Sequence, residues 1–561
     1  MKRKNIKRAI AAVLAAVCVI SVAGCGNKSG DESGKYFGDF DAKKICDGVT
    51  LTIAVPESTR IADWDENHMT KYIEETLGVD LEFEVYAAAN FTSKINTMVM
   101  SGDELPDMIM GNGLGSLVQT WGQAGALVEL TDYYEDANFA ANIQAAGEGA
   151  GYTIADYMKD GDGNIFGLPS MEQSDIAATW QRIWIYEPWV EALGAKMPET
   201  IDEYVTLCKQ VAAQDMNGNG SITDEVPLAG CGFNSNVGWG DWFEPLMSAF
   251  TYAYDQSFWV LSDGKLSAAY ATDEWKDGLT YIKQNFFDTG ILGDEVYTNT
   301  LDNVKATLYG TEAKVFSFVG WQYEGADYNI CNGYKAIDGL TDASGNNGES
   351  MYMPVRPEAR GCITVDCANP DAAFLVYDLM CSEYLSITTR FGEEGVDWLL
   401  TDEDTDLEGY IPATDKEIKW ASENYSLSFW GSTESTDKSF LQTGPYIRTQ
   451  EMHDTYGIKF SDTELGKLQY SAYLINNESV EAALANKREE VFDYAPLTNN
   501  ERDSISDQKS TLLEYVEEMT ASFLTGRKDI NAEWDSYIKE LDDIGLQEVL
   551  EVYQEAYSRV H

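Results

Sequence analysis

Basic residues are scarce in this chain of 561 residues. It has 39 lysines and arginines against 94 aspartates and glutamates, which gives a formal net charge of −55 at pH 7. Nucleic-acid binding needs clustered cations that displace the counterions of the phosphate backbone, so this composition argues against a nucleic-acid partner. A function on an anionic membrane surface or an acidic polymer is disfavoured for the same electrostatic reason, and only a local basic pocket stays open.

Histidine is scarcer still, because the chain contains only His68, His453 and His561. These three positions lack the spacing of metal ligands, so neither zinc chemistry built on histidine nor a His-dependent catalytic triad is expected. The chain also lacks G-x-S-x-G, H-E-x-x-H and Walker A sequences. We therefore expect no hydrolase or nucleotide-hydrolysing site of these kinds.

The cysteines do not form a disulfide framework. Of nine, Cys18 and Cys25 lie in the N-terminal segment treated next, and an odd, scattered set of seven is left. The seven are Cys46, Cys208, Cys231, Cys331, Cys362, Cys367 and Cys381. We predict mostly reduced, buried thiols that act as small hydrophobic side chains, and a single bridge such as Cys362 to Cys367 is the open alternative.

The N-terminal segment is built like a secretory signal. Five cations and no acid (Lys2, Arg3, Lys4, Lys7 and Arg8) precede an apolar run over residues 9–23. In a helix this run spans about 22 Å at about 1.5 Å per residue, which is short of the ~30 Å hydrocarbon core of a bilayer. Residues 1–24 are therefore predicted to be a cleavable leader rather than a transmembrane anchor.

The end of this leader, Val22-Ala-Gly-Cys25, resembles the lipobox of bacterial lipoproteins. The resemblance implies that Cys25 becomes the diacylglycerol-modified first residue, on the outer face of the cell membrane. Two acyl chains would hold a soluble body there stably, through the lipid anchor alone. An ordinary leader with an incidental cysteine is the alternative. Residues 25–46 are mostly small and polar, which predicts a flexible linker between lipid and body.

The body of the chain has the pattern of an α/β protein. Its apolar fraction of 44% is ample for packed cores, and its length predicts two or more domains. Apolar residues alternate over 49–55 and 81–85, as in strands, and recur at helical spacing over 69–77 and 91–99. Residues 107–110 are predicted as a third strand. This alternation of strands and helices predicts a parallel sheet with right-handed crossovers.

Several segments, in their order along the chain, resemble the solute-binding lipoproteins of bacterial carbohydrate ABC importers. This is the extracellular solute-binding protein family 1, and the resemblance is to its larger, oligosaccharide-binding branch, which includes alginate-binding proteins. The matching segments are Ser101-Gly-Asp-Glu-Leu-Pro-Asp107, Gly163-Asn-Ile-Phe-Gly-Leu-Pro169, Trp189-Val-Glu-Ala-Leu-Gly194, Pro198-Glu-Thr-Ile-Asp-Glu-Tyr204, Asn217-Gly-Asn-Gly220, Asp224-Glu-Val-Pro227, Asn369-Pro-Asp-Ala-Ala373, Gly392-Glu-Glu-Gly-Val396, Phe523-Leu-Thr-Gly526, Glu533-Trp-Asp-Ser-Tyr537 and Tyr553-Gln-Glu-Ala-Tyr557.

The resemblance implies a two-lobe periplasmic-binding-protein type II fold with a hinge and a central ligand cleft. Lobe one is expected over residues 49–168 and about 363–400, and lobe two over residues 169–361 with the C-terminal helices to 561; residues 400–520 stay unassigned. The implied function is capture of an oligosaccharide, without catalysis, and its delivery to permease subunits. Because the chain lacks a Walker A sequence, the ATPase of such an importer is expected to be a separate chain.

A loop beginning at Asp215 is the sharpest local motif. Asp215, Asn217 and Asn219 place oxygen side chains at positions 1, 3 and 5, and Gly220 at position 6 permits a sharp turn, as in calcium loops. Position 12 is Val226, so the acids come one and two places early. Related binding proteins close a similar loop with an Asp-Glu pair, which implies ligands from Asp224 and Glu225, with a backbone carbonyl near Ser221. We predict a structural calcium ion, with a plain Asn-Gly turn as the alternative.

Sugar contacts are expected at tryptophans, because the apolar face of a pyranose stacks on an aromatic ring. The candidates are Trp64 on lobe one and Trp239, Trp242 and Trp321 on lobe two. Hydroxyl partners are expected among Asp63, Arg182 and Asp241. The competing interpretation is that any one of these tryptophans belongs to the core.

Two other functions remain open at this stage. A secreted lipoprotein glycoside hydrolase also needs two carboxylates and aromatic platforms, but with 94 acids such pairs occur by chance. A surface adhesion or scaffold protein is the other alternative. Hydrolysis of a saccharide would favour the first, and the absence of any closure on saccharides would favour the second.

Overall fold

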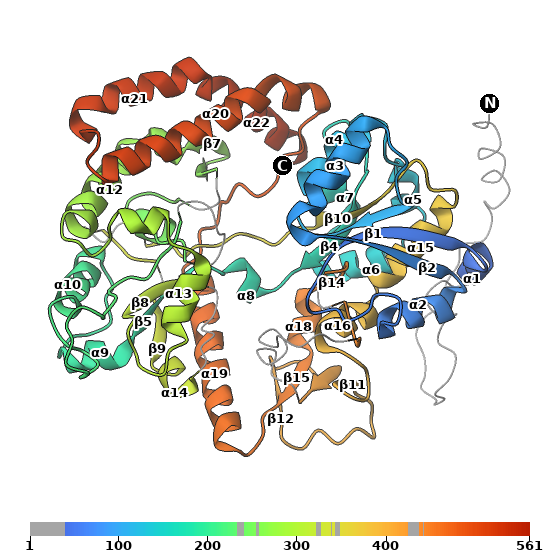
Figure 1. The fold of residues 1–561 in the computed structure, drawn as a ribbon, viewed down its shortest axis with the longest axis horizontal. Coiled ribbons are helices and arrows are strands. Elements are labelled where there is room, and N and C mark those ends of the chain that lie inside the picture. The colour runs from blue at the N-terminus through green and yellow to red at the C-terminus, as the bar shows by residue number, and fades with distance from the viewer. Residues whose placement is uncertain are drawn as a thin grey trace.

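The structure is a computed structural model, and it describes residues 40–232, 240–253, 257–320, 327–337, 339–342, 348–423, 437–440 and 443–561. The predicted leader, Cys25 and most of the linker lie outside these residues. Within the described part of the chain, no helix has both the length and the apolar character needed to cross a membrane. The chain forms two α/β lobes that lie side by side (Figure 1).

Lobe one is organised around a six-stranded sheet with the order β14-β4-β10-β3-β1-β2. The strands are β1 (Thr50–Pro56), β2 (Asp80–Tyr86), β3 (Met108–Met110), β4 (Leu168–Glu172), β10 (Glu358–Ile363) and β14 (Ile447–Arg448). The three strands predicted from the sequence, β1, β2 and β3, are parallel. The sheet is nevertheless mixed, because β10 runs antiparallel to β3 and β4.

Helices cover both faces of this sheet. Alternation along β1 directs Leu51, Ile53 and Val55 to one core and Ala54 to the other. The helices of lobe one are α1 (Ala42–Cys46), α2 (His68–Leu77), α3 (Phe91–Ser101), α4 (Gly115–Gln123), α5 (Thr131–Glu135), α6 (Ala141–Ala150), α7 (Ile154–Met158), α15 (Pro370–Met380) and α16 (Glu383–Phe391). Helix α2 ends at Gly78, which adopts the left-handed conformation that favours glycine.

Lobe two packs a three-stranded sheet and a hairpin against helices. The strands are β5 (Arg182–Tyr186), β8 (Ser317–Gly320) and β9 (Tyr334–Ile337), with the hairpin β6 (Trp259–Ser262) and β7 (Lys265–Ala268). Its first helices are α9 (Glu187–Ala192), α10 (Ile201–Val211), α11 (Phe243–Met247), α12 (Asp273–Ile282), α13 (Leu301–Leu308) and α14 (Tyr328–Cys331). Short 3-10 turns occur at Ala269–Ala271 and Asp294–Tyr297, and a π-helix at Lys283–Phe287. Lobe one has one such 3-10 turn at Ala88–Asn90, between β2 and α3.

Three C-terminal helices complete the core of lobe two: α20 (Asn499–Leu524), α21 (Ile530–Ile544) and α22 (Leu546–Val560). Trp534, Tyr537 and Leu541 of α21 are buried, and Gly545 ends this helix in the left-handed conformation.

The segment that the sequence left unassigned is divided between the lobes. A four-stranded sheet with the order β11-β13-β15-β12 and helix α18 (Gln450–Asp454) extend lobe one, beside α16 (Figure 1). Its strands are β11 (Trp398–Leu400), β12 (Tyr410–Pro412), β13 (Trp420–Ser422) and β15 (Tyr456–Lys459). The long helix α19 (Glu464–Ala485) then packs on α14 and β9 of lobe two.

The lobes are joined by several crossings of the chain. The short helix α8 (Asp175–Ala178) leads from β4 of lobe one to β5 of lobe two, and the chain returns ahead of β10. These two crossings lie together, since the Met353 amide donates to the Ala178 carbonyl (2.9 Å). A third crossing leads from β15 to α19. Because β4 pairs with β10 as far as Ser170, residues 169–172 lie in the lobe one sheet.

Candidate functional site

A cavity of about 290 Å³ opens between the two lobes. The crossing helix α8 lines it, with α16, α18, β13 and β15 on the lobe one side and α19 on the lobe two side. The residues that line it are Ser174, Asp175, Ile176, Arg390, Phe391, Ala413, Thr414, Trp420, Gln450, His453, Asp454, Tyr456, Ile458, Tyr473, Asn476, Asn477, Val480, Glu481 and Leu484. Ligand sites are commonly concave, with aromatic walls and a few placed polar groups, and this cavity has both.

Aromatic rings form the lobe one wall of this cavity. Trp420 and Tyr456 stack with their ring centroids 4.3 Å apart, and Phe391 meets the Trp420 ring edge-on at 4.8 Å. The Trp420 indole donates to the Met452 carbonyl (2.9 Å), which fixes its ring in the wall. Burial raises the pKa of the Tyr456 hydroxyl, and a hydrogen bond with the Ser422 side chain partly opposes this shift.

One face of α19 forms the opposite wall. Asn476, Asn477, Val480, Glu481 and Leu484 recur at intervals of three and four residues, so they share one side of the helix. Asn476 is only 4% exposed, and within the described part of the chain its side-chain oxygen accepts no hydrogen bond. A buried acceptor without a donor is unfavourable, so this oxygen is suited to accept from a ligand.

A charged network supports the lobe one side of the cavity from behind. The Glu172 carboxylate pairs with Arg448 and lies 3.5 Å from Nη1 of Arg390. His453 Nε2 is 2.8 Å from the same carboxylate. Burial, with Arg448 and Arg390 adding to it, lowers the pKa of His453 to about 3, so the imidazole is neutral at pH 7.

A second polar bridge ties the crossing helix to lobe one. The Gln450 side chain accepts from the Asp175 backbone amide (2.8 Å) and donates to the Asp454 carboxylate (2.7 Å). Lys416 pairs with the same carboxylate at 2.6 Å. Both ends of the Gln450 amide are therefore used within the protein.

The described residues among those predicted to contact sugar do not line this cavity. Trp64 packs in the lobe one core, with centroids 5.1 Å from Phe83 and 5.0 Å from Phe440. Trp242 is fully buried in the lobe two core and donates to the Gly232 carbonyl (2.9 Å). Both rings pack among core side chains and neither lines this cavity, which favours the core interpretation for these two tryptophans.

The predicted polar contacts also serve local structure. The Asp63 carboxylate accepts the Asp65 amide (2.9 Å) in a turn, and the Asp241 carboxylate accepts the Phe243 amide (2.9 Å) at the start of α11. Arg182 is buried and donates to the backbone and hydroxyl of Thr179, and burial lowers its pKa to about 9. Trp239 and Trp321 lie outside the described residues.

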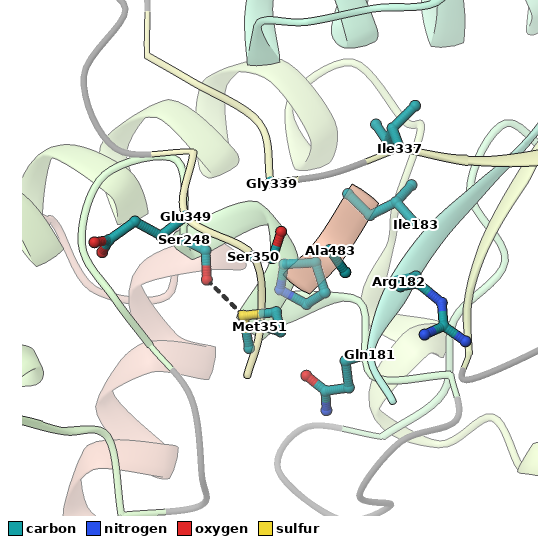
Figure 2. A pocket seen from close by; sticks show the side chains of 11 residues that line it. Gln181, Arg182, Ile183, Ser248, Ile337, Gly339, Glu349, Ser350, Met351 and Ala483 are labelled. Atoms are coloured by element: carbon teal, nitrogen blue, oxygen red, sulfur yellow. Dashed lines mark hydrogen bonds between the residues drawn. The ribbon is translucent and has the colours of Figure 1, made fainter. Parts of the chain in front are cut away.

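Arg182 instead borders a second, much smaller cavity inside lobe two, of about 20 Å³, the room of a single water. Figure 2 shows this cavity, with Ser248 directed at the Met351 sulfur (2.9 Å) and the Arg182 guanidinium directed away from both. It is too small for a sugar.

The predicted calcium loop follows α10 and is tightly organised. Asp215 accepts the backbone amides of Gly218 and Gly220 (2.7 and 2.8 Å), and both glycines have positive φ. Glu225 accepts the Met216 amide (2.9 Å) with one carboxylate oxygen. The loop is therefore a tight turn in which the carboxylates of Asp215 and Glu225 accept backbone amides.

The donors of this loop fit a hard cation. The second carboxylate oxygen of Glu225 and one oxygen of Asp224 are buried without a partner in the described residues. Asn217 and Asn219 add amide oxygens, the ligand type that calcium prefers. Asp224 also accepts from Asn219 (2.7 Å) and lies 3.3 Å from Lys314, and these hydrogen bonds lower its pKa to about 2. No group of three or more His, Cys, Asp and Glu side chains suited to a metal occurs in the described ranges.

All seven remaining cysteines are buried free thiols, as the sequence predicted; Cys362 and Cys367 are not bridged.

Comparison with known proteins reveals relatives along the whole chain, although no protein-family model matches it. It is 23% identical to the fructooligosaccharide ABC transporter substrate-binding protein FusA of Streptococcus pneumoniae, over 100% of this chain and 99% of FusA. The solved structure of FusA in complex with kestose superposes with a TM-score of 0.70 at 20% identity, over 91% of this chain and 99% of that one. The fold is that of a substrate-binding protein.

One further sequence relative and two further solved structures are also similar to this chain. Lipoprotein LipO of Bacillus subtilis is 24% identical over 53% of this chain and 52% of LipO. The alginate-binding protein AlgQ2, solved without calcium, has a TM-score of 0.63 at 20% identity, over 91% of this chain and 98% of AlgQ2. A FusA structure described as an EF-hand mutant is also among the similar structures.

The sequence alone missed the cavity residues Asp175, His453, Tyr456 and Asn476. Three of these four lie in the segment that could not be assigned to a lobe. The adjacent pair Asn476-Asn477 in the middle of an otherwise regular helix was the one available signal.

Proposed function

We propose that this chain is the solute-binding component of a carbohydrate ABC importer. It captures an oligosaccharide in the cavity between its lobes and presents the closed form to permease subunits, which work with a separate ATPase. The observation that carries this proposal is the interlobe cavity, which combines an aromatic wall, polar groups without partners and contributions from both lobes. The full-length similarity to FusA supports a saccharide as the solute.

The mechanism follows from the position of the cavity. A ligand that contacts both α19 and the lobe one wall gains more contacts when the lobes approach. A difference in affinity of about 5.5 kcal/mol between closed and open forms would move the equilibrium from mostly open to mostly closed. The crossing helix α8 lies in the cavity wall, so the same movement would reposition Asp175 on the ligand.

We expect a saccharide to bind without covalent change and to reduce the radius of gyration. A thermal-stability screen against an oligosaccharide panel would identify the ligand, followed by calorimetric titration and solution scattering. Asn477→Ala, Trp239→Ala and Trp321→Ala should each weaken binding, by about 1 to 3 kcal/mol where the side chain is buried against sugar. Tight binding with an unchanged radius would contradict closure, and release of smaller saccharides on incubation would favour a hydrolase.

A structural calcium ion at Asp215, Asn217, Asn219, Ser221, Asp224 and Glu225 is a further part of the proposal. Calcium that binds only the folded state stabilises it by about 2.7 kcal/mol at a hundred times its dissociation constant. Chelation should therefore lower the melting temperature of the wild type and leave an Asp215→Ala variant unaffected. Equal responses of the two proteins would show that the loop is only a turn.

We also propose that Cys25 carries the lipid anchor on the outer face of the cell membrane, as the lipobox-like sequence and the similarity to LipO suggest. Cys25→Ala should release the protein from the membrane fraction, because it removes the thiol that would carry the acyl chains. Fractionation of cells expressing either form tests this. Unchanged retention of the variant would remove the anchor from the proposal.

A further inference from the structure

Three of the polar groups that line the interlobe cavity are hydrogen-bond acceptors to which no described residue donates. The side-chain oxygen of Asn476 is buried without a donor. The carboxylates of Asp175 and Glu481, on α8 and α19, are exposed and make no hydrogen bond or ion pair to any described residue. An ionised carboxylate has no proton to donate, so all three groups need donors from the ligand.

The cations around the cavity are already engaged. Arg390 lies against Glu172, which it shares with the fully buried Arg448, and Lys416 pairs with Asp454. Lys487, which acts electrostatically on Asp175, is stacked over the Tyr352 ring at 4.5 Å. The pKa of His453 is lowered, so this imidazole carries no charge at neutral pH. Among the described residues that line the cavity, Asp175 and Glu481 are therefore the charged side chains that make no ion pair.

We infer that the cavity selects uncharged saccharides and discriminates against those that carry carboxylates, and that Asp175 and Glu481 are the residues that determine this selectivity. Each hydroxyl of a neutral sugar can donate one hydrogen bond to Asn476, Asp175 or Glu481. A uronate replaces such a donor with an anion that only accepts, so it would leave these groups unsatisfied and repel both carboxylates. This inference rests on the proposed function, since it concerns saccharides in the same cavity.

The test compares each neutral saccharide with its own acidic form. Kestose, maltotriose and mannotriose are titrated calorimetrically, and the best binder is then compared with the same trisaccharide oxidised at its primary hydroxyls to carboxylates. We expect the oxidised form to bind the wild type at least about tenfold more weakly. The reason is that its carboxylates and those of Asp175 and Glu481 repel each other over several ångströms at a partly exposed site. Added salt should narrow this ratio, because the repulsion is screened.

The decisive variant is Asp175→Asn combined with Glu481→Gln, which keeps the shapes of both side chains and removes their charges. It should reduce the preference for the neutral sugar about tenfold, while the distant exposed change Glu551→Gln on α22 should leave the ratio unchanged. If the double variant does not fold, Asp175→Asn alone and the salt dependence of the wild type provide the same comparison.

The outcomes separate this inference from the proposed function. Equal affinity of the wild type for both forms, tighter binding of the oxidised form, or an unchanged ratio in the folded variants would overturn the inference and leave saccharide capture standing. If no saccharide of either kind binds, the proposed function itself fails, and the inference fails with it.

Discussion

Replacing Glu172 with glutamine is expected to lower the free energy of unfolding by about 3 to 5 kcal/mol. Glu172 lies at the end of β4, where its carboxylate is paired with the fully buried Arg448 and also faces Arg390 and His453. Removing one partner of a buried pair leaves the other charge desolvated without compensation, which is far more unfavourable than losing an exposed pair. The amide fills the same space, so the loss reports the charge and not a cavity.

Chemical denaturation of the wild type and Glu172→Gln measures this difference. The matched control is Glu451→Gln on α18, which makes the same chemical change in an ion pair with Lys419 whose side chains are about half exposed. Exposed pairs contribute about 0 to 1 kcal/mol, so the control should lose little. A loss below about 1 kcal/mol in Glu172→Gln would show that the two arginines are satisfied without it.

The second large effect is a pH dependence that we assign to Asp378. This carboxylate on α15 is fully buried and accepts the backbone amides of Asn142 and Ile143 (3.1 and 3.0 Å) and the Asn142 side chain (2.7 Å) at the start of α6. Burial raises its pKa to about 7, although these hydrogen bonds partly oppose the shift. The folded state therefore binds this proton more tightly than the unfolded state, whose aspartate titrates near pH 4.

The sign of the effect follows from this difference. The contribution of Asp378 to stability is fully present below about pH 4 and is lost as the pH rises through about 7. The difference between the Asp378 pKa in the folded and the unfolded state corresponds to about 4 kcal/mol of folding stability, at about 1.4 kcal/mol per pKa unit. The wild type should thus lose about that much stability relative to Asp378→Asn between pH 4 and 8.

Urea denaturation of both proteins across this pH range tests the assignment, because every other titrating group is common to them and cancels in the difference. Glu551→Gln, an exposed change, should give a curve parallel to that of the wild type. If the Asp378→Asn curve is parallel as well, the carboxylate is ionised throughout and its three donors outweigh its burial.

Elements with a local sequence pattern could be predicted without the structure. The alternation over 49–55 produces β1, because one face of that strand meets each core. The ends of α2 at Gly78 and of α21 at Gly545 are marked in the sequence, because the left-handed conformation that ends a helix favours glycine. The oxygen spacing from Asp215 likewise appears as a folded loop, because its oxygen-bearing side chains are near neighbours in the chain.

The partners that complete each sheet and each lobe come from distant parts of the chain, and they are seen only in the folded structure. β10 enters the first sheet antiparallel between β3 and β4, and no local pattern encodes the direction of a strand that arrives some 190 residues later. Residues 400–520 were unassigned for the same reason: their short strands extend lobe one, whereas α19 joins lobe two.

The site depended most on the tertiary structure. Composition marks tryptophan both as a core residue and as a sugar platform, and only packing shows that Trp64 and Trp242 belong to the core. Asp175, Tyr456 and Asn476 come from three separate elements and meet at the cavity only because α8 crosses between the lobes and α19 of lobe two faces the lobe one wall. A sequence pattern predicts which residues share a face of one helix or strand, because those residues are near neighbours in the chain. A cavity between lobes is formed by elements that become neighbours only when the whole chain has folded.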